Sequence, residues 1–180
     1  MVLNKNSRFF ASATRVFFVL LMAVTFMSCS IAYTFNGASI DYTKVKTISI
    51  ADFNNVAELV HPPLAQEFTE KLRDKYVKQT KLRLLKAGGD MHIEGEIVGF
   101  ELTPMSIGQD AYSAETKLTV TFNVRFSNKS NPQDDFIDKK YTVFRVFDSS
   151  RLLSDAQDEI LPLMIEDVTD NIYNDTVAKW

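Results

Sequence analysis

The thiol of Cys29 is the side chain best suited to covalent chemistry in this 180-residue chain, which contains no other cysteine. A thiolate is a strong nucleophile, and a lone cysteine has no disulfide partner within its own chain. The small residue Ser28 directly precedes it, as a peptidase that cuts before the cysteine would require. These residue types predict cleavage after Ser28 and transfer of a lipid to the thiol of Cys29.

The residues before Cys29 indicate an export signal. Lys5, Arg8 and Arg15 give the chain a positive start without an acid, and an apolar run from Val16 to Phe26 follows. This run fits the apolar core of a secretory signal, and it is shorter than the roughly 20 residues that a spanning helix needs. We therefore interpret Met1–Ser28 as a signal peptide.

The segment Phe26-Met27-Ser28-Cys29 resembles a bacterial lipobox, although that motif usually begins with Leu. In a lipobox, cleavage makes the cysteine the new N-terminus and its thiol takes a diacylglycerol. Three acyl chains would hold the protein to a membrane almost permanently. The alternative is an ordinary signal peptide that ends at a cysteine by chance.

The two histidines of the chain give no catalytic or metal-binding arrangement. His61 precedes two prolines, and we interpret it as a surface or capping residue. His92 alternates with apolar neighbours on a predicted strand, so Glu94 and Glu96 share its face. One imidazole and two carboxylates on a single strand do not complete a metal cage.

The other charged residues also lack a catalytic motif. Asp134, Asp135 and Asp138 lie close together but do not have the spacing of a calcium loop. No Gly-rich phosphate loop, nucleophile elbow or His-Glu-x-x-His sequence occurs. We therefore predict a protein that is not an enzyme, with no catalytic residue, no metal and no cofactor.

A denser set of basic residues has two interpretations, contact with an acidic glycolipid or ordinary solvated charge. The net charge of −3, about −6 without the signal peptide, argues against nucleic acid as a partner. The basic set is Lys71, Arg73, Lys75, Lys78, Lys81, Arg83 and Lys86.

The first half of the mature chain reads as strand, helix and two strands. Residues 44–53 alternate as a strand that Asn54-Asn55 ends, and the apolar stripe of residues 63–79 predicts a helix. Short and long strands follow at 82–85 and 91–102, and Gly95 and Gly99 suggest a bulge or a close backbone contact. We expect Pro104 to end the long strand, with a loop over 105–114.

The second half predicts a hairpin and a final helix. Residues 117–126 alternate strictly, which is typical of a half-buried antiparallel strand, and residues 136–147 return after a polar loop. An apolar stripe predicts a helix over 154–174, which we expect Pro162 to kink or break.

The order β-α-β-β-β-β-α predicts an α+β fold, a two-layer α/β sandwich. The strand–helix–strand unit requires a parallel pair, whereas the later hairpins are antiparallel, so the sheet is mixed and mostly antiparallel. Two helices with single apolar stripes must cover one face of that sheet. We predict a lipidated leader over residues 29–43 and a single domain over residues 44–180.

Nearly the whole mature chain resembles the LptE family of Bacteroidota, the lipopolysaccharide-assembly lipoproteins. Each segment is weakly specific, but the ordered set is distinctive. The segments are Cys29, Tyr33–Ile40, Lys46–Ile50, Phe53–Asn55, Pro63–Leu72, Gln79–Leu82, Gly89-Asp90, Glu94–Ile97, Thr103-Pro104, Lys117–Val120 and Asp170–Asn174 up to Trp180.

The resemblance implies a non-catalytic lipoprotein anchored in the outer membrane, which faces the periplasm or lies inside a barrel lumen. Family members plug the β-barrel protein LptD and help to insert lipopolysaccharide. Of the family's functional residues, only the acylated cysteine is carried over, to Cys29, and no lipopolysaccharide-contacting residue is assigned. The alternative is a generic periplasmic lipoprotein that scaffolds another envelope complex.

Overall fold

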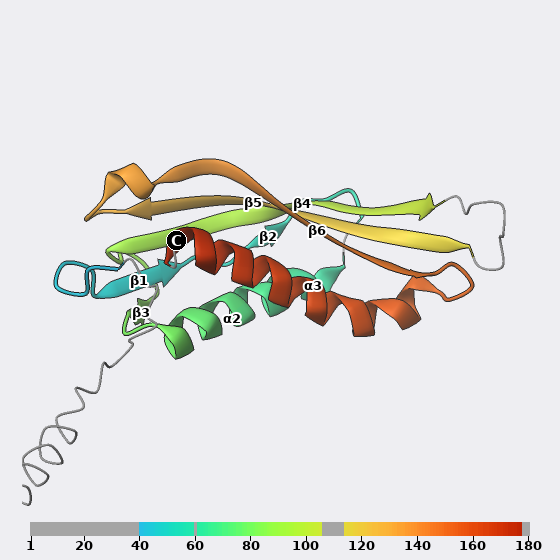
Figure 1. Ribbon diagram of the computed structural model, residues 1–180, viewed down its shortest axis with the longest axis horizontal. Coiled ribbons are helices and arrows are strands. Elements are labelled where there is room, and N and C mark those ends of the chain that lie inside the picture. Colours follow the sequence, from blue (N-terminus) through green and yellow to red (C-terminus); the bar gives the residue numbers. More distant parts are fainter. Residues whose placement is uncertain (1–39, 60, 106–113, 178–180) are drawn as a thin grey trace, which may run out of the picture. The chain divides into compact units, whose positions relative to one another are not determined.

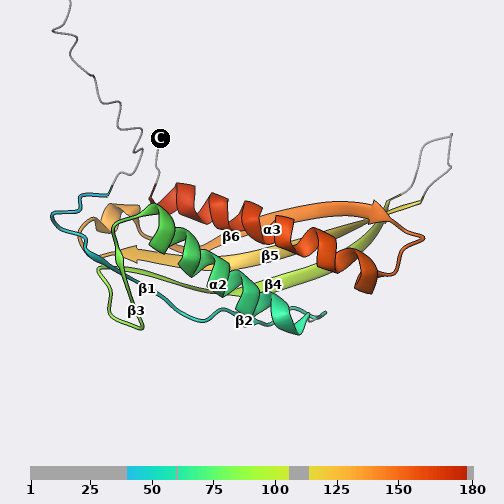
Figure 2. The ribbon, with the colours of Figure 1, turned by 90° about the horizontal axis from the view of Figure 1, so that it is seen from below.

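The computed structural model describes residues 40–59, 61–105 and 114–177. These residues form two layers, a six-stranded sheet with two long helices packed on one of its faces (Figures 1 and 2). The elements in chain order are β1 (Thr47–Ile50), β2 (Asn54–Asn55), α2 (Pro62–Gln79), β3 (Arg83–Leu85), β4 (Met91–Met105), β5 (Glu115–Asn128), the 3₁₀ turn η1 (Pro132–Asp134), β6 (Phe136–Asp148) and α3 (Leu153–Thr176). The predicted α+β class and two-layer sandwich are confirmed.

The sheet is mixed, with strand order β3-β1-β4-β5-β6. β1 and β3, the strands that flank α2, pair in parallel as predicted. β1 also pairs in parallel with β4, so it lies between two strands that follow it in the sequence. The antiparallel ladder β4-β5-β6 makes up most of the sheet, and β6 forms one of its edges.

The core fills the space between the helices and the sheet. Phe68 of α2 is fully buried, and its ring centroid lies 4.8 Å from that of Phe53 and 4.5 Å from that of Phe122 on β5. The predicted stripes are confirmed, because their apolar residues all point into this layer. The buried stripe residues are Leu64, Phe68, Leu72 and Tyr76 of α2, Leu118, Val120, Phe122, Val124 and Phe126 of β5, and Ala156, Ile160, Met164, Val168 and Ile172 of α3.

Both glycines of β4 have the roles expected for them. A Cβ atom on Gly95 would lie 2.3 Å from the carbonyl oxygen of Asn123 and 2.7 Å from the ring of Phe53, so the backbone approach excludes any side chain. The ladder with β5 shifts register between Ile97 and Gly99, which is the predicted bulge.

Two expectations about strand ends are wrong. Asn54 and Asn55 do not end the first sheet segment but form β2, which pairs with Glu96 and Ile97 of β4. Pro104 does not end β4, which continues to Met105 opposite Glu115. Beyond Ile97, β4 pairs only with β5 among the described residues, and proline is tolerated on such an edge because no ladder hydrogen bond is lost there.

Pro162 does not break α3, which runs without interruption from Leu153 to Thr176, and the alternative of a kink stays a prediction. Proline removes the hydrogen bond to the carbonyl four residues earlier, that of Asp158. Both residues lie on the exposed side of the helix, where water can bind this carbonyl. Packing of the opposite, buried side keeps the helix continuous.

Candidate functional site

Cys29, the predicted acylation site, and Trp180 lie outside the described residues. No helix within the described ranges combines the length and the hydropathy needed to cross a membrane. The candidate sites within the domain are therefore the histidines, the charged clusters and the grooves along the sheet.

His92 lies on the outer face of the sheet beside Glu94, as predicted, but its main partner is Ser49. His92 Nδ1 lies 2.8 Å from Ser49 Oγ, and Nε2 lies 3.5 Å from the carboxylate of Glu94. The parallel pairing of β1 with β4 brings Ser49 opposite His92, which the sequence pattern did not predict.

Ser49, His92 and Glu94 contact one another in the order of the residues of a hydrolase triad. The surroundings of these three side chains do not fit such a triad. Ser49 has no exposed surface, and its hydroxyl accepts a hydrogen bond from the amide of Gly89. A nucleophile must reach its substrate, which this hydroxyl does not. The hydrogen bond from Arg125 holds the pKa of Glu94 below its usual value, so the carboxylate belongs to a cross-strand ion pair. We interpret the contacts that join Ser49, His92 and Glu94 as a structural link between strands.

His61 and the acidic turn give no reaction centre either. His61 is the N-cap residue of α2, without a side-chain cap, and its ring stacks on Phe100. Asp135 accepts a hydrogen bond from the amide of Asn128, and Asp138 pairs with Arg125. Across the part of the chain that the structure describes, no three His, Cys, Asp or Glu side chains converge as metal ligands.

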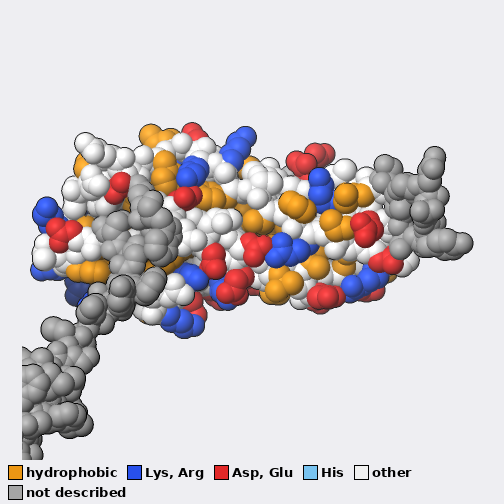
Figure 3. Space-filling view, in the orientation of Figure 1, with side chains coloured by type: hydrophobic (Ala, Val, Ile, Leu, Met, Phe, Trp, Pro, Cys, Tyr) orange, Lys and Arg blue, Asp and Glu red, His pale blue; other side chains and the backbone are white. Residues whose placement is uncertain are grey.

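Most of the predicted basic set is neutralised by carboxylates. Four of its members form ion pairs, Lys71 with Glu166, Arg73 with Asp52, Lys75 with Asp170 and Lys78 with Asp74. Figure 3 shows basic and acidic side chains interspersed over one face of the molecule. The interpretation as solvated and paired charge therefore fits these four residues.

Three basic side chains in and beside β1 and β3 differ from those four. Lys46, Arg83 and Lys86 are exposed, and within the described residues none of them forms an ion pair. Lys46 directly precedes β1 and lies beside Arg83 of β3, because the amide of Arg83 donates to the carbonyl of Lys46 at 2.9 Å. These three residues are named here the basic corner, and they are open to an anionic ligand. Arg83 and Lys86 belong to the predicted set, whereas Lys46 is an addition from the structure. The remaining member of the set, Lys81, has its Nζ atom 5.9 Å from the ring centroid of Tyr42.

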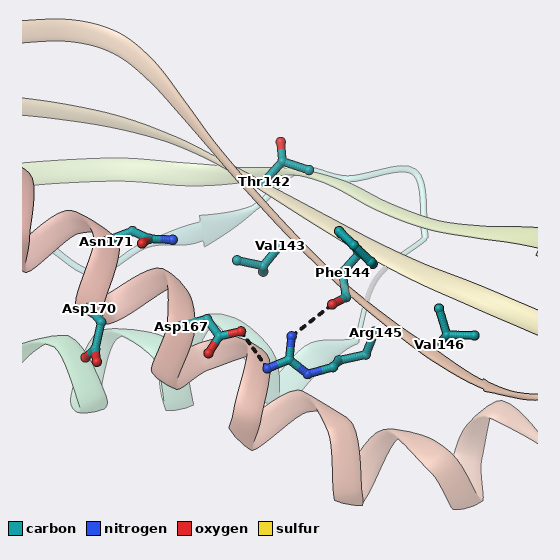
Figure 4. Close-up of a pocket in the computed structure, with 8 residues that line it drawn as sticks. All are labelled: Thr142, Val143, Phe144, Arg145, Val146, Asp167, Asp170 and Asn171. Atoms are coloured by element: carbon teal, nitrogen blue, oxygen red, sulfur yellow. Dashed lines mark hydrogen bonds and ion pairs between the residues drawn. The ribbon is translucent and has the colours of Figure 1, made fainter.

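A groove runs between β6 and α3 (Figure 4). It encloses about 550 Å³ and is open to solvent. The guanidinium of Arg145 crosses it, donating to the carbonyl of Phe144 at 3.0 Å and to the carboxylate of Asp167 at 2.5 Å. The lining residues are Thr142, Val143, Phe144, Arg145, Val146, Asp167, Asp170 and Asn171. The sequence predicted both elements but not this groove, because only the fold places α3 beside the last strand.

The model of the family described as LptE, lipopolysaccharide-assembly, matches residues 45–176. No curated protein is significantly similar to the chain.

Three solved structures are similar to this one. Lipoprotein B from Nitrosomonas europaea has a TM-score of 0.47 at 15% identity and covers 71% of this chain and 79% of its own. Rare lipoprotein B from Shewanella oneidensis has a TM-score of 0.45 at 13% identity and covers 70% and 89%. The hypothetical protein CT253 from Chlamydia trachomatis has a TM-score of 0.48 at 10% identity and covers 73% and 98%.

Proposed function

Because the chain belongs to the LptE family of lipopolysaccharide-assembly proteins, we propose that it is a lipoprotein of the outer membrane that complexes with an LptD-type β-barrel and assists the insertion of lipopolysaccharide. The family match over residues 45–176 is the observation that carries this proposal. Family membership also supports a role in assembly rather than in catalysis. The affiliation with Bacteroidota stays a prediction.

The proposal assigns the membrane anchor to Cys29. Cleavage after Ser28 would leave this thiol at the N-terminus of the mature protein, ready for a diacylglycerol and a further acyl chain such as palmitate. The leader of residues 29–43 would then connect the anchor to the domain of residues 44–180.

The fold suits contact with a water-lined barrel wall. Helices cover one face of the sheet, and the outer face presents polar and charged residues of β5. Its alternating residues are Lys117, Thr119, Thr121, Asn123 and Arg125, all of them partly exposed. The interior of a large transmembrane barrel is polar, so such a face loses little hydration when it lies against one.

The basic corner suits the other proposed partner, lipopolysaccharide. Lys46, Arg83 and Lys86 are available to bind an anionic headgroup without first breaking an ion pair. Replacement of all three by glutamate is expected to weaken binding of purified lipopolysaccharide by the lipoprotein. Lys140→Glu, which changes an exposed charge on β6, is the matched control and is expected to have no effect.

The first experiment is an affinity pull-down of the full-length lipoprotein from its native outer membrane in detergent. We expect equimolar recovery of a large β-barrel of the translocon type, and recovery without any barrel would contradict the proposal. Depletion of the protein separates this role from that of a generic scaffold. Loss of surface lipopolysaccharide supports the translocon role, whereas intact lipopolysaccharide favours a scaffold for another complex.

A further inference from the structure

The outer edge of β6 has free backbone hydrogen-bonding groups. β6 is the last strand on its side of the sheet and pairs only with β5 among the described residues. The amide of Ser149 donates to the carbonyl of Ala114, which fixes the alternation of hydrogen bonds along this ladder. Residues at odd positions of β6 from 141 to 147 therefore bond to β5, and the N–H and C=O groups of Thr142, Phe144 and Val146 point outward.

This edge has the sequence of a strand that pairs readily. Tyr141–Phe147 contains aromatic and β-branched residues, a single charge and neither glycine nor proline. Long exposed edges of this kind are usually shortened, charged or covered, because they template pairing with another chain. Arg145 covers one outward carbonyl, that of Phe144. The apolar side chains of Phe144 and Val146 remain 58% and 38% exposed beside it.

α3 contributes carboxylates to the neighbouring groove, beside the guanidinium of Arg145 from β6. α3 carries seven carboxylates and no basic residue, and two of these carboxylates, Asp167 and Asp170, line the groove. Their side chains are still 44% and 45% exposed although each is paired. A strand added beside β6 would point alternate side chains toward these carboxylates and toward the outer face that carries Phe144.

We propose that the outer edge of β6, at residues 142–146, docks an extended segment of a partner protein in which basic residues facing α3 alternate with apolar residues facing outward. Main-chain hydrogen bonds would supply the attachment, and the two faces would supply the selectivity. This inference goes beyond the proposed function and does not depend on it, because it defines the partner by its chemistry.

A second copy of this chain fits the edge poorly. Pairing of β6 with its own symmetry mate would bring two α3 helices, each without a basic residue, to the same side of the joint. Like charges across such a joint are destabilising. A basic partner segment meets the same carboxylates favourably.

The test uses photo-crosslinking of the full-length protein in its native membrane, with p-benzoylphenylalanine in place of Phe144. The same probe in place of Val77, which is exposed on α2, is the control for position. Mass spectrometry of the digested adduct identifies the captured segment. We expect an adduct from position 144 whose segment alternates basic and apolar residues, and no such adduct from position 77.

Two pairs of variants test the mechanism. Val146→Pro removes an outward N–H without removing a bond to β5, and it should lower the adduct yield at least about fivefold, whereas Val146→Thr should change it less than about twofold. Asn171→Lys places a positive charge in the groove and should also lower the yield, whereas Asn171→Asp should preserve it. Thermal melts establish whether each variant is folded. If Val146→Pro does not fold, the comparison of Asn171→Lys with Asn171→Asp tests the proposal.

Three results would overturn the proposal. They are an adduct with a second copy or with this chain's own leader, a captured segment without the alternation, and an unchanged yield in folded Val146→Pro together with Asn171→Lys.

Discussion

Arg73 and Arg145 make the same kind of contact, a hydrogen bond to a backbone carbonyl, near opposite edges of the sheet. Arg73 donates to the carbonyl of Ile50 at 2.6 Å and pairs with Asp52 at 2.9 Å, at the point where β3 no longer covers β1. Arg145 donates to the carbonyl of Phe144 and pairs with Asp167. Near each of these two edges, an arginine that pairs with an aspartate thus donates a hydrogen bond to a carbonyl that no neighbouring strand binds.

We expect replacement of these two arginines by alanine to have different effects. Arg145→Ala uncovers the carbonyl of Phe144 on a 13-residue edge strand and removes the partner of Asp167, so we expect a higher yield of the adduct captured from position 144. Because the ion pair is partly exposed, the loss of unfolding free energy should be below about 1 kcal/mol. Photo-crosslinking from p-benzoylphenylalanine at position 144 measures this yield, and chemical denaturation measures the stability.

Arg73→Ala is the matched control for this prediction. It should cost a similar free energy but leave this yield unchanged, because the carbonyl of Ile50 lies on β1, away from β6. An equal rise of the yield in both variants would show that lost charge, rather than the uncovered β6 edge, causes it.

Gly95→Ala is expected to destabilise the domain by about 1–3 kcal/mol, the usual cost of overpacking a core. The added methyl group would lie 2.3 Å from the Asn123 carbonyl, and both contacting strands are held in the ladder. Gly99→Ala should cost less, because its nearest neighbour, the side chain of Thr121, lies at 3.2 Å. Urea unfolding compares the two, and an equal cost would contradict the close contact at Gly95.

Asp90→Asn is expected to reduce the stability at neutral pH and to weaken its dependence on acid. The carboxylate of Asp90 accepts hydrogen bonds from the amides of Lys46 and Thr47 and from the hydroxyl of Thr47, and these bonds lower its pKa. A lowered pKa in the folded state stabilises the protein above the unfolded pKa of about 4, and this contribution is lost as the pH falls through the folded value.

Melting temperatures of the Asp90 variant and the parent protein, measured between about pH 7 and pH 3, test this sign. The difference between them should be largest at neutral pH and shrink toward the acid end, below the unfolded pKa of about 4. A difference that grows with acid would mean that Asp90 is not bound as a carboxylate in the folded protein.

Cys29→Ser is expected to remove the membrane anchor. A hydroxyl does not replace the thiol in lipid transfer, so the protein should leave the membrane fraction and lose incorporation of an alkyne-labelled fatty acid. Ser30→Ala, beside the cysteine, should keep both properties. Labelling that survives in Cys29→Ser would place the lipid elsewhere and overturn this assignment.

The sequence predicted most elements but not their ends. Apolar stripes identify α2, α3 and β5 because burial depends directly on a period of 3.6 or 2 residues. Pro104 and Pro162 misled the prediction because proline breaks an element only where its missing N–H would have been needed. An edge strand and a solvent-facing helix side remove that need, and neither is visible in the local sequence.

The functional features likewise divide into those that the sequence predicts and those that only the tertiary structure shows. The sequence by itself determined the fold class and the family resemblance, because both depend on residue types in local order. The export signal and the acylation of Cys29 rest on the same kind of pattern and stay predictions. Only the tertiary structure decided that Ser49 meets His92, that Arg145 spans from Phe144 to Asp167, and which basic residues stay unpaired among those described. Ser49 and His92, like Arg145 and Asp167, lie far apart in the chain, and the geometry of their contacts depends on strand order and register, which local patterns do not specify.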